Sequence, residues 1–155
     1  MRISPDILAA ARNDLSALVA IPSVSARGEG MEACADEVER LLAEAGFSTG
    51  QHKGDVGPFV VGETGDGPFT LVIYNHYDVQ PEDPVDEWVT PPFSPDVRDG
   101  RVYARGAADN KGQIATRLAV IRAMRDEQGT LPFSLRWVIE GEEESGSTNF
   151  AAIAR

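Results

Sequence analysis

The sequence predicts an α/β domain in which helices cover both faces of a mixed, largely parallel sheet. Two observations favour this class. Segments with the 3.6-residue periodicity of amphipathic helices are interspersed with short apolar runs that are typical of strands. One of these runs, residues 71–74, has mostly apolar side chains at consecutive positions, as expected for a strand buried on both faces. The chain has 155 residues, which is enough for one domain with a hydrophobic core.

Two helices are expected before residue 47. The first begins at Ser4, whose hydroxyl can cap the helix and which is followed by a proline and an acidic residue. The second spans about residues 31–45 and ends at Gly46, because glycine readily adopts the left-handed conformation that terminates helices. Its apolar stripe includes Cys34, which we interpret as a buried core residue and not as a nucleophile.

Strand-like runs follow the second helix. Residues 59–62 and 69–74 flank the glycine-rich segment 62–67, which predicts a hairpin turn between two neighbouring strands. A loop with five prolines at 80–100 comes next. Residues 101–105 then indicate another short strand.

The last third of the chain continues the same alternation. Residues 111–126 have the apolar periodicity of a helix, and residues 133–140 alternate as a strand does. The tail at 147–155 resembles the first turns of a further helix. This order of elements completes the α/β pattern.

The charge balance excludes several classes of function. The net charge is −11, whereas a face that binds nucleic acid needs an excess of Lys and Arg, and an anionic membrane attracts basic segments.

No apolar run approaches the ~20 residues that span a membrane, and the N-terminus lacks the apolar core of a signal peptide. A single cysteine cannot form an internal disulfide, which fits a cytoplasmic protein. We therefore expect neither nucleic acid nor a membrane as a partner.

Histidine and acidic residues follow three of the predicted strands. His76 and Asp78 come directly after the first of these strands and point to the same side of an extended chain. Asp109 follows the second strand, and residues 140–144, at the end of the third, include four glutamates. If the strands share one sheet, these side chains meet at its carboxyl edge, where open α/β sheets bind ligands.

These residue types are the ligands that zinc and other divalent cations use in proteins. A bound cation would remove the mutual repulsion of clustered carboxylates and would supply a Lewis acid and a water of low pKa. Each feature has a simpler explanation when taken alone. Residues 140–144 can be a solvated acidic loop, Asp109 can be a helix N-cap, and His76 can be an ordinary loop histidine. Their joint occurrence after three strands favours a metal site.

Several motifs occur between residues 21 and 147 in a recognisable order. They are Ile21-Pro-Ser-Val-Ser25, His76-Tyr-Asp-Val-Gln-Pro81, Trp88 with Pro92-Phe93, Gly106-Ala-Ala-Asp-Asn-Lys-Gly112 and Glu140-Gly-Glu-Glu-Glu-Ser-Gly146. Together they resemble the zinc peptidases of the M20 type, which are the relatives of carboxypeptidase G2, succinyl-diaminopimelate desuccinylase, acetylornithine deacetylase, aminoacylase and carnosinase. The resemblance implies the three-layer catalytic domain of these enzymes.

The resemblance also implies a role for each of five residues. His76 would ligate one zinc ion, and Asp78 would hydrogen-bond the far nitrogen of His76 and fix its orientation. Asp109 would bridge two zinc ions, which sit ~3.5–4 Å apart in such sites. Glu143 would be the general base that takes a proton from the bridging water. Glu144 would ligate the second zinc ion.

Two details of this assignment need the structure. A one-residue shift of the motif would give the last two roles to Glu142 and Glu143 instead. The peptide bond after Asp109 is cis in the family and would be cis here. The implied cofactors are two Zn²⁺ ions per complete site, and Co²⁺ or Mn²⁺ could take their place.

The implied function is zinc-dependent hydrolysis of an amide bond in a dipeptide or an N-acyl amino acid by a metal-activated water. Family members are more than twice as long, with a further acidic ligand, a late histidine ligand and a lid domain that often forms homodimers. His52 lies outside every motif and is expected on the surface. We therefore expect residues 1–155 to be the N-terminal portion of a catalytic domain that carries about half of the site. The lid or dimerisation domain and the C-terminal catalytic part would be absent.

Two other functions remain open. The chain could be a catalytically inactive remnant that keeps the fold and binds a metal or a partner weakly. It could also be a plain acidic binding module, although that leaves the aligned polar residues unexplained. Within the family, the motifs after Gly106 and Glu140 are more similar to the dipeptidase and carnosinase branch than to the desuccinylase branch.

Overall fold

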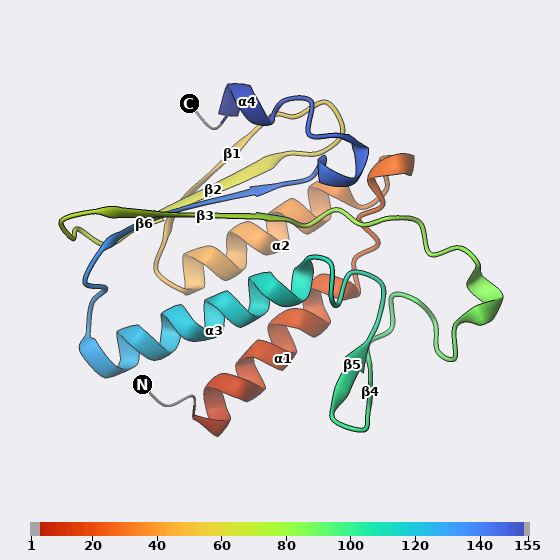
Figure 1. Ribbon diagram of the computed structural model, residues 1–155, viewed down its shortest axis with the longest axis horizontal. Coiled ribbons are helices and arrows are strands. Elements are labelled where there is room, and N and C mark those ends of the chain that lie inside the picture. Colours follow the sequence, from red (N-terminus) through yellow and green to blue (C-terminus); the bar gives the residue numbers. More distant parts are fainter. Residues whose placement is uncertain (1–3, 154–155) are drawn as a thin grey trace.

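The three long helices lie on one face of a four-stranded sheet in the computed structural model, which describes residues 4–153 (Figure 1). The helices are α1 (Pro5–Val19), α2 (Met31–Glu44) and α3 (Lys111–Gln128). The strands follow the order β1-β2-β6-β3, and their bounds are Ser48–His52 for β1, Phe59–Thr64 for β2, Thr70–His76 for β3 and Ser134–Glu140 for β6. The short helix α4 (Phe150–Ile153) packs on the other face. The predicted α/β class with a mixed sheet is confirmed.

Parallel and antiparallel pairing are combined in this sheet. The strands β3 and β6 are parallel, whereas β1 pairs with β2, and β2 with β6, in the antiparallel sense. Within the described residues, parallel pairing in the sheet is confined to β3 and β6, so the sheet is mixed as expected but not largely parallel. The main hydrophobic core lies between the sheet and the three helices and includes Trp137, Leu41 and Leu118, all fully buried. Burial of each such side chain stabilises the fold by roughly 1.5–3 kcal/mol.

Polar contacts cap both ends of α1. The Ser4 hydroxyl accepts a hydrogen bond from the backbone N–H of Ile7 at 3.2 Å, as the sequence predicted. At the other end, the buried Lys111 ammonium donates to the backbone carbonyls of Leu18 at 2.8 Å and Ile21 at 2.7 Å. Burial lowers the pKa of Lys111. Because this lysine is the first residue of α3, it fastens the start of α3 to the end of α1.

The helices otherwise agree with the sequence prediction. Gly46 follows α2 with a φ of +81°, and α3 spans the expected segment. Cys34 is fully buried, and burial raises the pKa of its thiol. His52 is exposed on β1, as expected. Helix α4 lies within the tail where a helix was expected, of which residues 154–155 lie outside the described residues. None of the helices within residues 4–153 is long and apolar enough to cross a membrane.

The predicted hairpin between residues 59–62 and 69–74 is wrong. Strand β6 lies between β2 and β3, so these two strands are not neighbours. Their glycine-rich connection passes the start of β6 closely, because a Cβ atom at Gly65 would meet the Phe133 carbonyl oxygen at 2.3 Å. The hairpin of this sheet joins β1 to β2 instead. Strand β1 escaped prediction because it is mostly polar and lies at the edge of the sheet.

The expectation that residues 71–74 are buried on both faces is also wrong. Strand β3 is the last strand of the sheet, and its only strand neighbour within the described residues is β6. Leu71, Val72 and Tyr74 are 43%, 62% and 40% exposed. A consecutive apolar run therefore lies on an open sheet edge, which is a surface that promotes pairing with another chain.

We expect the purified chain to self-associate through the edge of β3. The change Val72→Lys should shift the chain toward monomer, because a charged side chain opposes edge-to-edge pairing. Val97 is a matched control, since it is 59% exposed against 62% for Val72 but lies on a different strand. Sedimentation velocity over a range of concentrations measures the effect. Equal association of the Val72→Lys and Val97→Lys variants would contradict the prediction.

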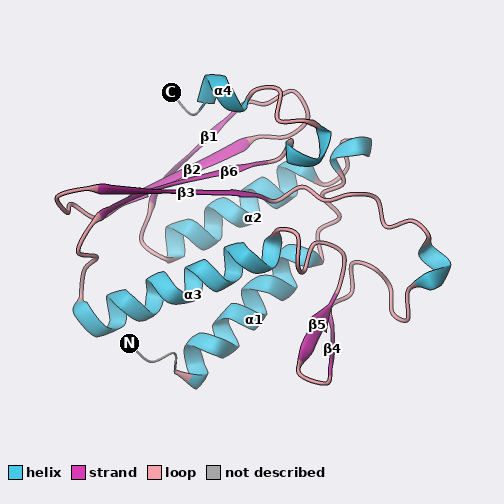
Figure 2. Cartoon of the chain, viewed as in Figure 1, coloured by secondary structure: helices cyan, strands magenta, loops and turns pink. Residues whose placement is uncertain are grey.

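The strand expected at 101–105 forms outside the main sheet. Strand β5 (Arg101–Tyr103) pairs with β4 (Asp96–Arg98) in a separate two-stranded sheet (Figure 2). The turn between them consists of Asp99 and Gly100, with φ values of 50° and 75°. Positive φ at both positions is typical of a type I′ turn, for which Asp-Gly is a favoured sequence. Strand β4 and the turn lie inside the segment 80–100 that was expected to be a loop, and the Asp-Gly pair at its end indicates the hairpin.

Candidate metal centre

The candidate site lies where the parallel strands β3 and β6 end side by side. His76 is the last residue of β3, and it lies opposite Glu140, the last residue of β6. The glutamates at 143 and 144 follow in a short 3-10 helix, Glu143–Ser145. The parallel pairing thus brings two of the three predicted groups to one edge of the sheet, as expected for this type of sheet.

Asp109 reaches the same place by a different route. It lies in the turn before α3, beyond the separate β4–β5 sheet, so the idea that all three groups follow strands of one sheet is wrong for this residue. The N-cap position of α3 is Asn110, so the N-cap explanation for Asp109 is also wrong. The peptide bond between these two residues is cis, as the resemblance implied.

Three side chains in this region converge on one point. One ligand atom each from His76, Asp109 and Glu144 lies within 4.8 Å of the others. The His76 Nε2 atom is 3.1 Å from the Asp109 Oδ1 atom, and it is 3.9 Å from the Glu143 Oε2 atom. One imidazole nitrogen with two carboxylates is a donor set that suits zinc, and the spacing allows a shared ion. These residues therefore fit a divalent cation.

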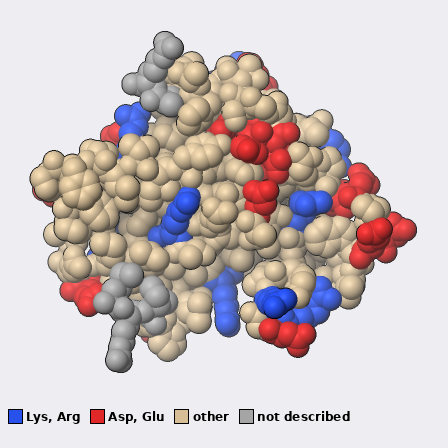
Figure 3. Space-filling view, viewed as in Figure 1, with Lys and Arg blue, Asp and Glu red and all other residues tan. Residues whose placement is uncertain are grey.

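Burial differs sharply among these side chains. The side chain of His76 is 6% exposed, whereas those of Asp109 and Glu143 are 73% and 43% exposed. The histidine therefore lies at the buried base of the site, and the carboxylates lie on its solvent-exposed side. Figure 3 shows acidic side chains gathered on this part of the surface, while the area over β3 carries few charges. Two exposed carboxylates beside a buried imidazole attract cations to this point.

The ring of His76 faces an acceptor on each side. Its Nδ1 atom lies 3.1 Å from the backbone carbonyl oxygen of Asp78 and 3.4 Å from the Oδ1 atom of the same residue. Burial alone would lower the pKa of His76, but hydrogen bonding to Asp78 and the charges of Asp78 and Glu143 outweigh it and raise the pKa to about 9. In the metal-free chain, His76 is therefore protonated at pH 7. The contact at Nδ1 leaves Nε2 directed at Asp109.

Asp78 also holds the segment that carries the glutamates. Its side chain is fully buried, and its two carboxylate oxygens accept hydrogen bonds from the backbone N–H groups of Glu143 at 3.2 Å and Glu144 at 2.9 Å. The resemblance implied that this carboxylate hydrogen-bonds the far nitrogen of His76 and fixes its orientation. In the structure, the closer contact of Asp78 to the His76 ring is made by its backbone carbonyl. Asp78 therefore links the histidine to the glutamate segment.

The four glutamates at 140–144 divide into two pairs. The Glu140 carboxylate is buried and accepts hydrogen bonds from the Tyr74 hydroxyl at 2.5 Å and the Ser147 hydroxyl at 3.0 Å, and burial raises its pKa. The Glu142 carboxylate, 1% exposed, accepts one from the Val56 backbone N–H at 2.9 Å and others from Asn149. The explanation as a solvated acidic loop is therefore wrong for these two residues.

The second pair faces the site. Glu143 approaches His76, and Glu144 belongs to the converging group of three. The Glu144 Oε2 atom also accepts a hydrogen bond from the Gln80 amide at 2.8 Å. The carboxylate of Glu142, by contrast, is occupied by the segments at Val56 and Asn149. This arrangement favours the assignment of site roles to Glu143 and Glu144.

Single alanine variants should separate these two groups. Glu142→Ala leaves partly buried N–H groups of Val56 and Asn149 without an acceptor, so we expect it to lower the free energy of unfolding by about 2 kcal/mol. Glu144→Ala removes a partly exposed side chain, so we expect it to change stability by less than about 0.5 kcal/mol and to weaken zinc binding. Urea unfolding in the presence of a chelator and a zinc titration measure the two effects. The reverse pattern would favour the one-residue shift of the motif that gives the site roles to Glu142 and Glu143.

Sequence reasoning missed Asn75, which is buried one residue before His76. Its side chain is hydrogen-bonded to Trp137, Arg117 and Asn110. The available signal was a polar residue at the end of an apolar run. Gln80 was also missed, although it lies within the quoted motif His76-Tyr-Asp-Val-Gln-Pro81.

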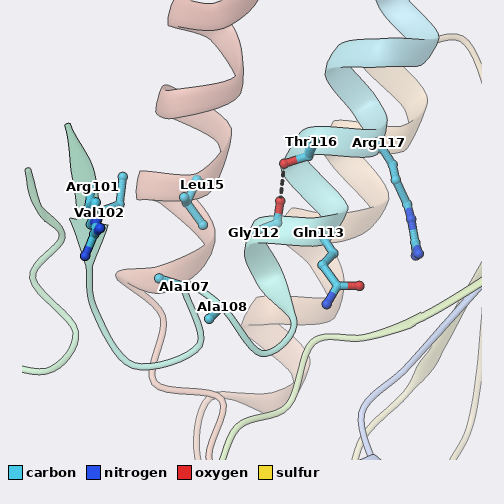
Figure 4. Close-up of a pocket in the computed structure, with 9 residues that line it drawn as sticks. All are labelled: Leu15, Arg101, Val102, Ala107, Ala108, Gly112, Gln113, Thr116 and Arg117. Atoms are coloured by element: carbon cyan, nitrogen blue, oxygen red, sulfur yellow. Dashed lines mark hydrogen bonds between the residues drawn. The ribbon is translucent and has the colours of Figure 1, made fainter.

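A pocket of about 550 Å³ lies on the other side of the turn that carries Asp109. It lies between α1, α3 and β5, and Figure 4 shows Ala107 and Ala108 at its edge with Gln113 and Arg117 on α3. The residues of the converging group do not line it. The converging group is therefore separate from this pocket.

Comparison with known proteins places the chain in a family. The family model described as peptidase family M20/M25/M40 matches residues 72–155. The chain is 40% identical over 92 residues to the human Beta-Ala-His dipeptidase, an alignment that covers 58% of this chain and 18% of that protein. It is 37% identical over 133 residues to the succinyl-diaminopimelate desuccinylase of Methylobacillus flagellatus, covering 85% of this chain and 34% of that protein.

A solved structure shows the same relationship. An M20 family metallo-carboxypeptidase from Sulfolobus solfataricus matches with a TM-score of 0.87 and 38% identity, over 92% of this chain and 33% of that protein. The chain thus spans about a third, or less, of the length of these relatives. The family model matches more than half of the residues of this chain, and the chain therefore belongs to peptidase family M20/M25/M40.

Proposed function

We propose that the chain carries about half of a two-zinc site that hydrolyses amide bonds. The observation that carries this proposal is the convergence of His76, Asp109 and Glu144 within 4.8 Å at the carboxyl ends of β3 and β6. The membership in a peptidase family supports the reaction class. The three residues would hold the metal, with Asp109 shared between two Zn²⁺ ions or, in their place, Co²⁺ or Mn²⁺.

Each residue then has a definite task. Zinc, when bound, supplies a Lewis acid that polarises the amide carbonyl and lowers the pKa of water. The His76 Nδ1–H group donates to the Asp78 carbonyl, which keeps the ring fixed and its Nε2 atom available. The Oε2 atom of Glu143, 3.9 Å from His76 Nε2, takes a proton from the attacking water and later gives it to the leaving amine. Asp78 keeps Glu143 and Glu144 in place through their backbone N–H groups.

The proposed substrate is a dipeptide or an N-acyl amino acid. The names of two relatives support this class, since one is a dipeptidase and the other removes a succinyl group from an amino acid. The net charge of −11 disfavours nucleic acid and an anionic membrane as partners. We propose a cytoplasmic location, because the single cysteine cannot form an internal disulfide.

Each zinc ion would receive two ligands from this chain, whereas a catalytic zinc usually has three. We therefore propose that residues 1–155 form the N-terminal portion of the catalytic domain. The remaining acidic and histidine ligands, and a lid that forms homodimers, would belong to the whole protein. The share of each relative that the chain covers supports this division. The chain alone should bind zinc weakly and turn over little substrate.

A calorimetric titration of the purified chain with zinc tests the proposal. We expect binding that Asp109→Ala abolishes, because this residue is the shared ligand. Hydrolysis of dipeptides and N-acyl amino acids is then measured in the zinc-loaded chain and in the variant. Equal zinc binding by the chain and the Asp109→Ala variant would overturn the metal site. Zinc binding that Asp109→Ala abolishes, without turnover, would identify the chain as an inactive part of the site.

A further inference from the structure

Asp109 is held in place mainly by its neighbours in the chain. Its side chain is 73% exposed, and its hydrogen bond to His76 is the contact that points into the site. An exposed carboxylate on a turn has many available rotamers, so the backbone on either side must restrict it. The next residue, Asn110, is anchored by a side-chain contact to the interior.

That contact is made by Asn75, which is 1% exposed. The Asn75 Oδ1 atom accepts hydrogen bonds from Trp137 Nε1 at 3.1 Å and from the Arg117 guanidinium. Its Nδ2 group donates to the Asn110 Oδ1 atom. The chemistry fixes this orientation, because indole and guanidinium groups can only donate. The amide oxygen must therefore face Trp137 and Arg117, and the amide nitrogen must face the turn.

The two asparagines stand next to two candidate ligands. Asn75 precedes His76 in β3, and Asn110 follows Asp109 in the turn. The contact between the asparagines and the contact between His76 and Asp109 are thus consecutive links between the same two segments. Asn75, on the inner link, is buried and joined to β6 and α3, whereas Asp109, on the outer link, is open to solvent. The inner link can therefore set the geometry of the outer one.

We propose that Asn75 is a positioning residue that, through Asn110, holds the Asp109 carboxylate against the imidazole of His76. This inference rests on the proposed function in that Asp109 and His76 are taken as the metal ligands. It assigns a role to a residue outside the motifs that define the resemblance. Loss of such a supporting contact typically weakens metal binding by about 10–100-fold.

The test uses the metal-free chain and ¹⁵N NMR of the histidine rings at a fixed pH. The chain has only two histidines, and His52, exposed on β1, provides an internal reference. The His76 Nε2 signal reports the nearby carboxylate, and Asp109→Ala gives its position when that carboxylate is removed. The main variant is Asn110→Leu, which removes the acceptor but leaves the bonds from Trp137 and Arg117 to Asn75. Gln113→Leu is the matched control, since it makes the same change of amide to leucine in the first turn of α3.

We expect Asn110→Leu to move the His76 Nε2 signal most of the way to its position in Asp109→Ala. Adding Asp109→Ala to Asn110→Leu should then move it little further, and Gln113→Leu should leave it unchanged. Asn75→Ala, if it folds, should give the same shift as Asn110→Leu. A folded Asn110→Leu or Asn75→Ala variant with the wild-type His76 signal would overturn the proposal. A shift of equal size in Gln113→Leu would do the same.

A zinc competition assay with a chromophoric chelator adds a second readout. We expect Asn110→Leu to raise the zinc dissociation constant by about 10–100-fold at a temperature where the variant is still folded in a chelator. Some stability is lost as well, because the buried Asn75 amide loses its acceptor, so the His76 signal is the readout that separates positioning from stability. An unchanged zinc affinity in Asn110→Leu would count against the proposal. If the wild-type chain binds no zinc, the proposed function fails, and the NMR result alone decides whether Asn75 positions Asp109.

Discussion

Replacing Asp78 by alanine is expected to weaken zinc binding by about 10–100-fold and to lower the free energy of unfolding by about 3 kcal/mol. The fully buried carboxylate accepts the backbone N–H groups of Glu143 and Glu144 and lies 3.4 Å from His76 Nδ1. Its loss leaves two N–H groups without their acceptor and frees the segment that carries two site residues. Both effects follow from one side chain, because it joins the histidine to the glutamates.

The Asp78→Asn variant is the matched control. An asparagine of the same shape keeps one acceptor oxygen, so it should keep part of the stability and lose less zinc affinity than alanine does. Urea unfolding in a chelator and a zinc competition assay measure the two quantities separately. If Asp78→Ala keeps full zinc affinity while losing stability, Asp78 supports the fold and does not position the ligands.

Local sequence patterns predicted the features that depend on neighbouring residues. The cap at Ser4, the end of α2 at Gly46 and the strand β6 follow from periodicity and from the conformational preferences of single residues. The meeting of His76 with Glu144 was also predictable, because polar residues after apolar runs accumulate at the carboxyl edge of a sheet. Each of these features is encoded within a few residues of chain.

Features that depend on partners far away in sequence could not be predicted in the same way. The apolar run 71–74 describes a strand but not its neighbours. Within the described residues, β3 is an edge strand because β6 pairs with one side of it and no strand pairs with the other. The glutamates at 142 and 144 are equivalent in sequence, yet the backbone directs one toward Val56 and Asn149 and the other toward the site. Asn75 is understood only once Trp137 and Asn110 are placed against it.

Zinc affinity is expected to fall by about 100-fold as the pH is lowered from 8 to 6. The cause is competition between zinc and a proton for the Nε2 atom of His76, whose pKa in the metal-free chain is raised to about 9. Below that pKa, each unit of pH lowers the fraction of neutral imidazole about tenfold. Above it the affinity should become constant. Chelator competition at several pH values, corrected for protonation of the chelator, measures the slope.

The raised pKa of His76 comes first from Asp78 and then from the charge of Glu143, and the Glu143→Gln variant measures the second contribution. The negative charge of Glu143 helps to keep His76 protonated, so the neutral amide should lower the pKa of His76 and move the break in the affinity curve to lower pH.

Raising the pH is expected to change folding stability and zinc affinity in opposite directions. A histidine with a raised pKa stabilises the metal-free fold fully below its unfolded pKa of about 6.5, and this contribution is lost as the pH rises through about 9. Metal-free wild type should therefore lose stability over this range relative to a His76→Gln variant, while its zinc affinity increases. A zinc affinity that does not change between pH 6 and 8 would show that zinc does not displace a proton from His76 when it binds.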